Sequence, residues 1–156
     1  MLLKPLVALV LVLSLPSIGS SADVNDPDAK DRDALQGTWL PSAAELAGKK
    51  YPDEIRKSVK LVIKDDKYVV TVGTEGPDEG TVKLNAAVKP KEMDITGTDG
   101  PNKGKTFLCI YELNRDQTKG DTLRICYDLS GKSRPKEFKT QAGTKLYLVT
   151  YKRQNP

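Results

Sequence analysis

The side chains that most often carry out chemistry in enzymes are few in this chain of 156 residues, which has two cysteines, Cys109 and Cys126, and no histidine. Without histidine there is no imidazole general base, no histidine-based catalytic triad and no histidine-ligated metal. Two cysteines cannot provide the four thiolates of an all-cysteine zinc site or an iron–sulfur cluster. A catalytic thiol would also lack a histidine to activate it. We therefore expect no enzymatic activity, no metal and no cofactor.

The two cysteines give conflicting indications about a disulfide bond. In an exported protein, two cysteines are typically paired. Apolar alternation argues against pairing, because it places Cys109 on the inner face of its strand with Tyr111, and Cys126 on the outer face of the next strand with Arg124. Thiols that point to opposite faces cannot reach disulfide geometry without a bulge. The sequence therefore leaves a Cys109–Cys126 disulfide open.

The carboxylates also offer little catalytic potential. Glycoside hydrolysis needs two facing carboxyl groups, but alternation puts Asp94 and Glu112 on outward faces, where surface charge is the simpler interpretation. The acidic run 23–33 lacks the central glycine and final glutamate of a calcium loop. We expect residues 23–34 to form a flexible lead-in, with Asp28 or Asp31 capping a short helical turn. The formal charge of +4, with lysines spread along the chain, does not indicate nucleic-acid binding.

The N-terminus has the pattern of an export signal. Lys4 precedes an apolar run, Leu6 to Leu15, and small residues follow up to Ala22. The apolar run is shorter than the roughly 20 residues that span a bilayer, so a cleaved signal peptide over residues 1–22 is favoured over an uncleaved anchor. We expect a periplasmic or secreted protein with no membrane span after cleavage.

Short strands with two-residue alternation dominate the rest of the chain. Strands are expected at 37–40, 59–64, 68–72, 81–84, 92–96, 106–113, 121–128 and 145–152, with a short helix at 52–57. Turn residues separate them. Eight strands of this length suit a closed barrel, because closure removes the unpaired edges of an open sheet. We predict an all-β domain over residues 35–156, an eight-stranded antiparallel up-and-down barrel with one or two short helices.

Four stretches in register resemble a known family. They are Leu35-Gln-Gly-Thr-Trp39, Lys60-Leu-Val-Ile-Lys-Asp-Asp-Lys-Tyr68, Ile110-Tyr-Glu-Leu113 with Gly120-Asp-Thr-Leu-Arg-Ile-Cys126, and Arg134-Pro-Lys-Glu-Phe138. Together they resemble the uncharacterised lipocalin-like domain abundant in planctomycete bacteria. The resemblance implies a calycin-type barrel in an exported protein and assigns no activity. In this chain, residues Asn114 to Lys119 lengthen a turn that is tight in the family, either as a tolerated insertion or as a projecting loop.

The wider lipocalin resemblance rests on Gly37 and Trp39, which match the Gly-x-Trp signature. It implies that Trp39 plugs the closed end of the barrel and that Arg153 or Lys152 lies across the indole, as a cation–π contact allows. The segment that contains Arg134, Pro135 and Phe138 has two interpretations. It is either a recognition loop at the barrel mouth or a structural crossover anchored by its aromatic residue.

The expected function is binding without catalysis. Alternation predicts an inward face from which we select five candidate ligand-binding residues: Tyr68, Met93, Phe107, Tyr111 and Tyr127. The last strand is apolar on both faces, so its inward residues are either Tyr147, Val149 and Tyr151 or Leu146 and Leu148. We predict a monomeric binding module for a small apolar ligand, which needs a cavity of about 300 Å³ or more, or for a partner protein. A protease-inhibitor-like barrel and a structural envelope protein with a filled core are the alternatives.

Overall fold

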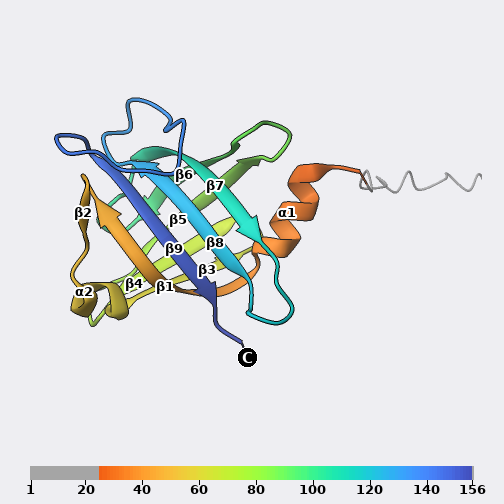
Figure 1. The fold of residues 1–156 in the computed structure, drawn as a ribbon, viewed down its shortest axis with the longest axis horizontal. Coiled ribbons are helices and arrows are strands. Elements are labelled where there is room, and N and C mark those ends of the chain that lie inside the picture. The colour runs from red at the N-terminus through yellow and green to blue at the C-terminus, as the bar shows by residue number, and fades with distance from the viewer. Residues whose placement is uncertain (1–24, 156) are drawn as a thin grey trace, which may run out of the picture.

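Alternating apolar and polar residues build the strands of an antiparallel sheet in the computed structural model, which describes residues 25–155 (Figure 1). The strands are β1 (Gly37–Leu46), β2 (Lys49–Lys50), β3 (Val59–Lys64), β4 (Lys67–Val72), β5 (Asp78–Asn85), β6 (Lys91–Asp99), β7 (Thr106–Asn114), β8 (Thr122–Asp128) and β9 (Leu146–Arg153). Leaving aside β2, which pairs only with β1, each strand pairs with the next, and β1 also pairs with β9. This closed, eight-stranded up-and-down barrel with two short helices confirms the predicted fold class. The predicted signal peptide, residues 1–22, lies outside the described residues.

The first strand is longer than predicted. Residues 37–40 were expected, but β1 continues past Pro41 to Leu46. The register between β1 and β9 shifts between Pro41 and Ala43, and the Ser42 hydroxyl donates a hydrogen bond to the Thr150 carbonyl, 3.0 Å away. A bulge of this kind accommodates a proline, which cannot donate to a strand ladder. The strand then turns into β2 as an appended hairpin.

The barrel interior contains the residues that alternation assigned to it. The buried core includes Leu61, Ile63, Met93, Leu123 and Ile125. On β9 the inward residues are Tyr147, Val149 and Tyr151, which settles the parity that the sequence left open. On the strands before β9, two-residue periodicity therefore placed the core residues named above on the correct face.

One end of the barrel is closed by α1 (Pro27–Leu35), which lies opposite α2 (Asp53–Ser58) in Figure 1. The cap of α1 is Asp26, whose carboxylate accepts from the Asp28 backbone N–H at 3.0 Å. The prediction that Asp28 or Asp31 caps this helix is wrong, because Pro27 starts the helix and leaves both residues inside it.

Asp28 and Asp31 instead attach α1 to the barrel. Asp28 Oδ1 accepts from the Ala86 backbone N–H at 2.6 Å. Asp31 Oδ2 accepts from Lys91 Nζ at 2.6 Å and from the Tyr111 hydroxyl at 2.7 Å. Charge-assisted hydrogen bonds of this length are among the stronger polar contacts in proteins, so the helix is fixed against the end of the barrel that contains Tyr111.

Trp39 fills the closed end beneath α1. Its side chain is fully buried, and its Nε1 donates to the Leu35 carbonyl at 2.9 Å. The Arg153 guanidinium lies 4.2 Å from the indole centroid, so Arg153 rather than Lys152 makes the expected contact. Gly37 has φ +120°, and a Cβ there would lie 3.0 Å from Arg153 Nη1. Glycine at this position therefore makes room for the guanidinium.

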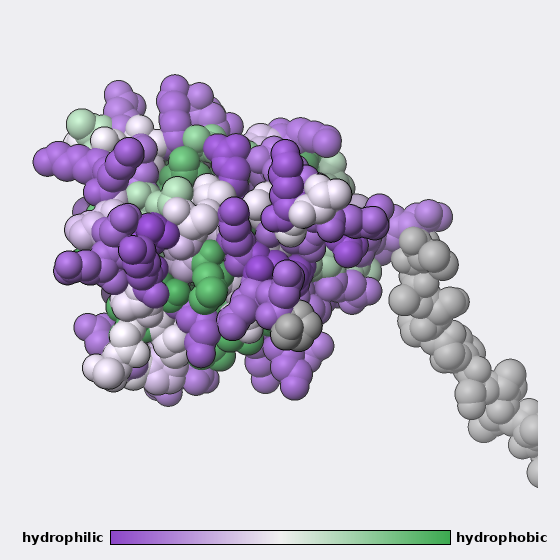
Figure 2. Space-filling model, turned by 60° about the horizontal axis from the view of Figure 1, so that its bottom comes forward, coloured by the Kyte–Doolittle hydropathy of each residue, from purple (hydrophilic) through white to green (hydrophobic). Residues whose placement is uncertain are grey.

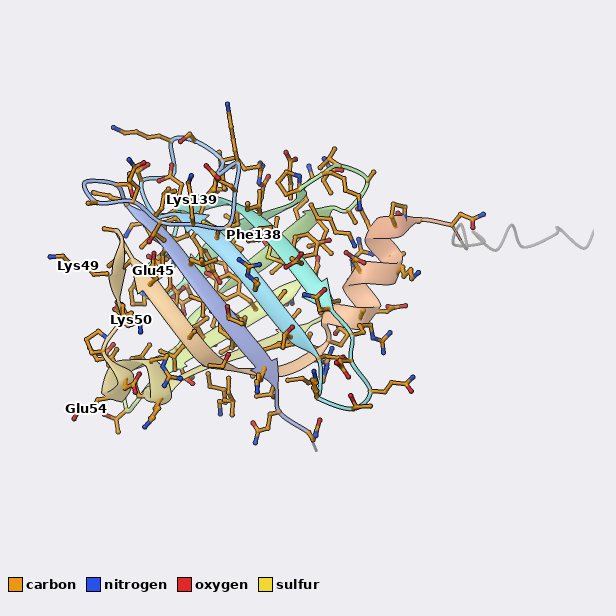
Figure 3. All side chains as sticks on the ribbon, viewed as in Figure 1. Glu45, Lys49, Lys50, Glu54, Phe138 and Lys139 are labelled. Carbon is orange, nitrogen blue, oxygen red and sulfur yellow. The ribbon has the colours of Figure 1, made fainter. Side chains whose placement is uncertain are left out.

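The long connection between β8 and β9, residues 129–145, covers the outside of the barrel. Arg134 Nη1 donates to the Cys109 carbonyl at 2.7 Å, and Arg134 Nη2 donates to Asp94 Oδ1 at 2.6 Å. Pro135 is buried, and the Phe138 ring lies 4.8 Å from the Arg124 guanidinium. Figure 3 shows Phe138 and Lys139 on this connection, outside the strands. These contacts support the structural interpretation of the 134–138 segment over a recognition loop at the mouth.

Asp128 holds the start of the same connection. Its Oδ1 accepts from the Ser130 backbone N–H and hydroxyl, and its Oδ2 accepts from the Ser133 backbone N–H and hydroxyl. Burial alone would raise the pKa of Asp128, but these hydrogen bonds outweigh it and lower the pKa below its ordinary value. The buried carboxylate is therefore charged at neutral pH and fixes the path of the chain as it leaves the barrel.

Candidate ligand cavity

A cavity of about 250 Å³ occupies the half of the barrel away from α1. Its deeper walls are aliphatic and aromatic side chains of β3 to β9, and its mouth is bordered by Ile55 of α2, Leu129 and Tyr147. The volume is slightly below the 300 Å³ expected for a ligand carrier. It still exceeds the roughly 150 Å³ of an apolar cavity that can bind benzene. A single ring or a short chain would therefore fit.

Four of the five predicted ligand-binding residues line this cavity, namely Tyr68, Met93, Phe107 and Tyr127. Tyr111 does not line it, so this cavity gives no support to the predicted role of Tyr111 in ligand binding. Alternation correctly points Tyr111 inward, but its position along β7 puts it at the closed end, where its hydroxyl donates to Asp31. Alternation along a strand determines which face of the sheet a residue lies on. Its depth in the barrel depends instead on where α1 packs.

Sequence reasoning did not assign several of the residues that line the cavity. Tyr51, Tyr147 and Tyr151 line the cavity, together with Asp78 and Asn102. Five of the six tyrosines in the chain thus surround one space. Tyr147 and Tyr151 were among the alternatives left open, but Tyr51 and Asn102 lie outside the predicted strands, where alternation carries no information. The sequence alone did not predict that these tyrosines line the same cavity.

Tyrosines form one wall of the cavity. The ring centroids of Tyr51 and Tyr147 are 5.5 Å apart, and those of Tyr127 and Tyr147 are 5.7 Å apart. The Tyr127 and Tyr151 hydroxyls are hydrogen-bonded at 3.3 Å. Burial raises the pKa of Tyr127 well above its ordinary value and that of Tyr151 to about 12. This wall therefore presents neutral rings with hydroxyl groups available for hydrogen bonding.

The opposite side of the mouth contains one carboxylate, that of Asp78, with the groups that donate hydrogen bonds to it. Asp78 Oδ2 accepts from the Tyr68 hydroxyl and from Asn102 Nδ2, both at 3.0 Å, and Oδ1 accepts from the Asn102 backbone N–H at 2.9 Å. Tyr68 can lie across β5 because its neighbour there is Gly80, where a Cβ would lie 2.6 Å from the ring. The glycine thus positions the Tyr68 hydroxyl against Asp78.

The cysteines are free, so the disulfide that the sequence left open is not formed. In the ladder Cys109 pairs with Tyr127 and Cys126 pairs with Ile110, one position out of step. Cys109 is buried inside the barrel, whereas Cys126 faces outward and its thiol contacts the Lys139 carbonyl at 3.7 Å. The alternation of inward and outward residues argued against a disulfide, whereas export favoured one. The structure agrees with the alternation, because side chains on opposite faces of the sheet keep the two thiols apart.

The carboxylates considered as candidates for catalysis also lie on the outer surface of the barrel. Glu112 pairs with Arg124 at 3.2 Å, and Asp94 is held by Arg134, as outward parity predicted. In residues 25–155 no group of three potential ligands from histidine, cysteine, aspartate and glutamate is placed to hold a metal ion. No helix in the same range has the length and apolar character needed to cross a membrane.

The inserted turn between β7 and β8 is folded on itself. Asp116 Oδ1 accepts from the Thr118 hydroxyl at 2.7 Å and from the backbone N–H groups of Thr118 and Lys119 at 2.8 and 3.0 Å. These hydrogen bonds, that of the Thr118 hydroxyl first, lower the pKa of Asp116 below its ordinary value. The insertion is therefore a locally stabilised turn at the end of the barrel away from the cavity mouth.

The described residues define a class of molecule, a closed up-and-down β-barrel with an internal cavity that opens at the end opposite its N-terminal helix. Comparison of the chain with protein-family models, with curated proteins and with solved structures finds no match. The resemblance to the lipocalin-like family thus stays a prediction from the motifs quoted above.

Proposed function

We propose that the protein is an exported, non-enzymatic binding module that takes one small, largely apolar molecule into its barrel. The observation that carries this proposal is the 250 Å³ cavity, whose lining is apolar apart from tyrosine hydroxyls and one polar cluster. Sites for small molecules are concave, mostly apolar and equipped with a few polar groups that orient the ligand. The cavity has each of these features.

The mouth supports entry from solvent. Ile55 and Leu129 border it and remain 44% and 37% exposed, so the rim presents apolar surface to solvent. Apolar residues at a rim favour the transfer of an apolar molecule from water into the interior. Ligand access would therefore require no opening of the strand ladder.

Binding of a protein partner has less support. On the face shown in Figure 2, hydrophilic side chains dominate the described residues, and hydrophobic ones show as small, separate areas. The projecting loop 114–119 and the candidate recognition segment 134–138 form hydrogen bonds with their own residues or with the barrel. An inhibitor-like barrel would need a projecting loop free to engage a protease, so internal ligand binding is the function that we favour.

Filling the cavity tests this proposal. Val70 lines the cavity, whereas its neighbour Val69 points outward on the same strand. Isothermal titration of the purified full chain with indole, a neutral aromatic molecule, should show binding. Val70→Trp should weaken it at least tenfold, and the matched control Val69→Trp should leave it within about twofold. Circular dichroism would verify that both variants fold. Equal indole affinity in wild type and Val70→Trp would place binding outside the barrel and overturn the proposal.

A further inference from the structure

Asp78 is the one charged side chain that lines the cavity in the described part of the chain. All three groups that contact its carboxylate are neutral donors: the Tyr68 hydroxyl, the Asn102 backbone N–H and Asn102 Nδ2. In residues 25–155, Asp78 forms no ion pair with a lysine or an arginine, although Asp31, Asp94 and Asp121 all do. Its negative charge is thus held in place but not neutralised.

The donors around Asp78 leave it able to accept another hydrogen bond. An ionised carboxylate offers about four acceptor positions, and three are occupied. Burial, followed by the hydrogen bond to Asp78 and its charge, raises the pKa of Tyr68 above its ordinary value. The phenol therefore stays a neutral donor and does not share a charge with Asp78. A ligand that approaches through the mouth would meet a half-buried carboxylate with acceptor capacity remaining.

The tyrosine wall faces this carboxylate across the barrel. Asp78 is the first residue of β5, and Tyr147 is near the start of β9. In the closed ring of eight strands, β5 and β9 are four strands apart in either direction, so they lie on opposite sides. Both residues line the same cavity at its open end. A molecule in the mouth would therefore have a negative charge on one side and aromatic rings on the other.

We infer that the ligand of this barrel is a small organic cation, an ammonium group on an aromatic or similarly apolar body, with the ammonium at Asp78 and the body against Tyr147, Tyr127 and Tyr51. This inference rests on the proposed function of the cavity. An ammonium ion would donate to the carboxylate in a charge-assisted hydrogen bond. The tyrosine faces would stabilise the apolar body and any positive charge that reaches them.

The same charge disfavours the opposite kind of ligand. A carboxylate-bearing molecule such as a short fatty acid would place its negative charge in a largely apolar space beside Asp78, with no lysine or arginine among the described lining residues to receive it. An unpaired like charge in such a setting is costly. The cavity should therefore rank ligands of one shape by their charge, with cation above neutral molecule above anion.

A series of three probes of similar size tests this ranking in the unmodified protein. At pH 7, 2-phenylethylamine is cationic, 2-phenylethanol is neutral and phenylacetate is anionic. Titration calorimetry of the full chain should give an affinity at least tenfold higher for the amine than for the alcohol, and the acid should bind most weakly. If the alcohol or the acid binds as tightly as the amine, the inference fails. If the inference fails in this way, but the alcohol binds and Val70→Trp abolishes alcohol binding, the proposed function stands and only the preference for a cation is refuted. Binding of none of the probes, nor of indole, would overturn both.

A pair of charge-matched variants locates the effect. Asp78→Asn removes the carboxylate charge and keeps one acceptor oxygen, whereas Glu79→Gln removes the same charge from the adjacent, exposed residue. Asp78→Asn should reduce the preference for amine over alcohol to within about threefold and leave alcohol binding little changed. Glu79→Gln should retain the full preference. A preference that survives in a folded Asp78→Asn variant would contradict the assignment. If that variant does not fold, the probe ranking in the wild type remains decisive.

Discussion

Cys109 and Cys126 show how a single step in register decides the chemistry of a residue. A shift of one residue in the β7–β8 ladder would set the two thiols opposite each other on one face, whereas the observed register buries one inside the barrel and one under the outer connection. Burial raises the pKa of Cys109 well above its ordinary value and that of Cys126 to about 11. Both thiols should therefore be protonated and shielded at neutral pH, which makes them poor nucleophiles.

Thiol titration checks this prediction. In protein purified without reductant, an aromatic disulfide reagent at pH 8 should label neither cysteine of the folded chain within minutes, because attack requires an accessible thiolate. In strong denaturant the same sample should release two thiols per chain. Absence of thiols in denaturant before reduction, with two after reduction, would show that a disulfide forms and that the β7–β8 register differs from the one described.

At the scale of elements, a single side chain joins three parts of the fold that are distant in sequence. Arg153 at the end of β9 packs on Trp39 of β1, and its guanidinium donates to the Ala34 carbonyl at the end of α1 and to the Gln36 carbonyl. Its Nε also donates to Asp121 Oδ2 at 3.1 Å. A planar group with five donors can meet these acceptors together, which a lysine ammonium cannot do.

Arg153→Lys should consequently destabilise the protein although it preserves the charge. Loss of the stacked cation–π contact and of hydrogen bonds to half-buried carbonyl groups should lower the free energy of unfolding by about 2 kcal/mol. Lys152→Arg, at the exposed neighbouring position, should change it by less than about 0.5 kcal/mol. Urea denaturation followed by Trp39 fluorescence measures both. An unchanged midpoint for Arg153→Lys would mean that the closed end does not depend on this side chain.

Local patterns predicted the strands well and their ends less well. Alternation located all eight barrel strands, because inward and outward positions differ in polarity along each of them. It stopped β1 at Leu40, since Pro41 and the following Ser-Ala-Ala carry no alternating signal, and it therefore missed β2. The helix cap was misplaced for a related reason. Several aspartates precede Leu35, and only the position of Pro27 distinguishes the cap from residues that bind the barrel.

At the scale of the whole molecule, the barrel has two unlike halves that the sequence did not separate. Around the closed end, Trp39, Tyr111 and α1 fill the interior, whereas the other half retains a cavity. Tyr111 and Tyr127 both point inward on neighbouring strands, yet one is hydrogen-bonded beneath a helix and the other lines open space. That distinction depends on contacts between α1 and strands far away in sequence, so neither parity nor composition could predict it. Asp78 was missed for a different reason, because it precedes the predicted strand 81–84 and its place in the cavity follows from closure of the ring.

Because the cavity is enclosed by strands from around the whole ring, occupation of it should stabilise the entire barrel. A ligand that binds the folded chain and not the unfolded one adds about 2.7 kcal/mol of stability at a hundredfold excess over its Kd. For a domain of this size, that corresponds to a rise in Tm of about 10 °C. With 2-phenylethylamine at this excess, calorimetric melting of wild type should show the full shift in one cooperative transition. At the same concentration, Val70→Trp, whose affinity should be at least tenfold lower, should shift by no more than about 5 °C. A shift of equal size in both proteins would show that the amine acts on the outer surface, and splitting of the wild-type transition would show that the two halves unfold separately.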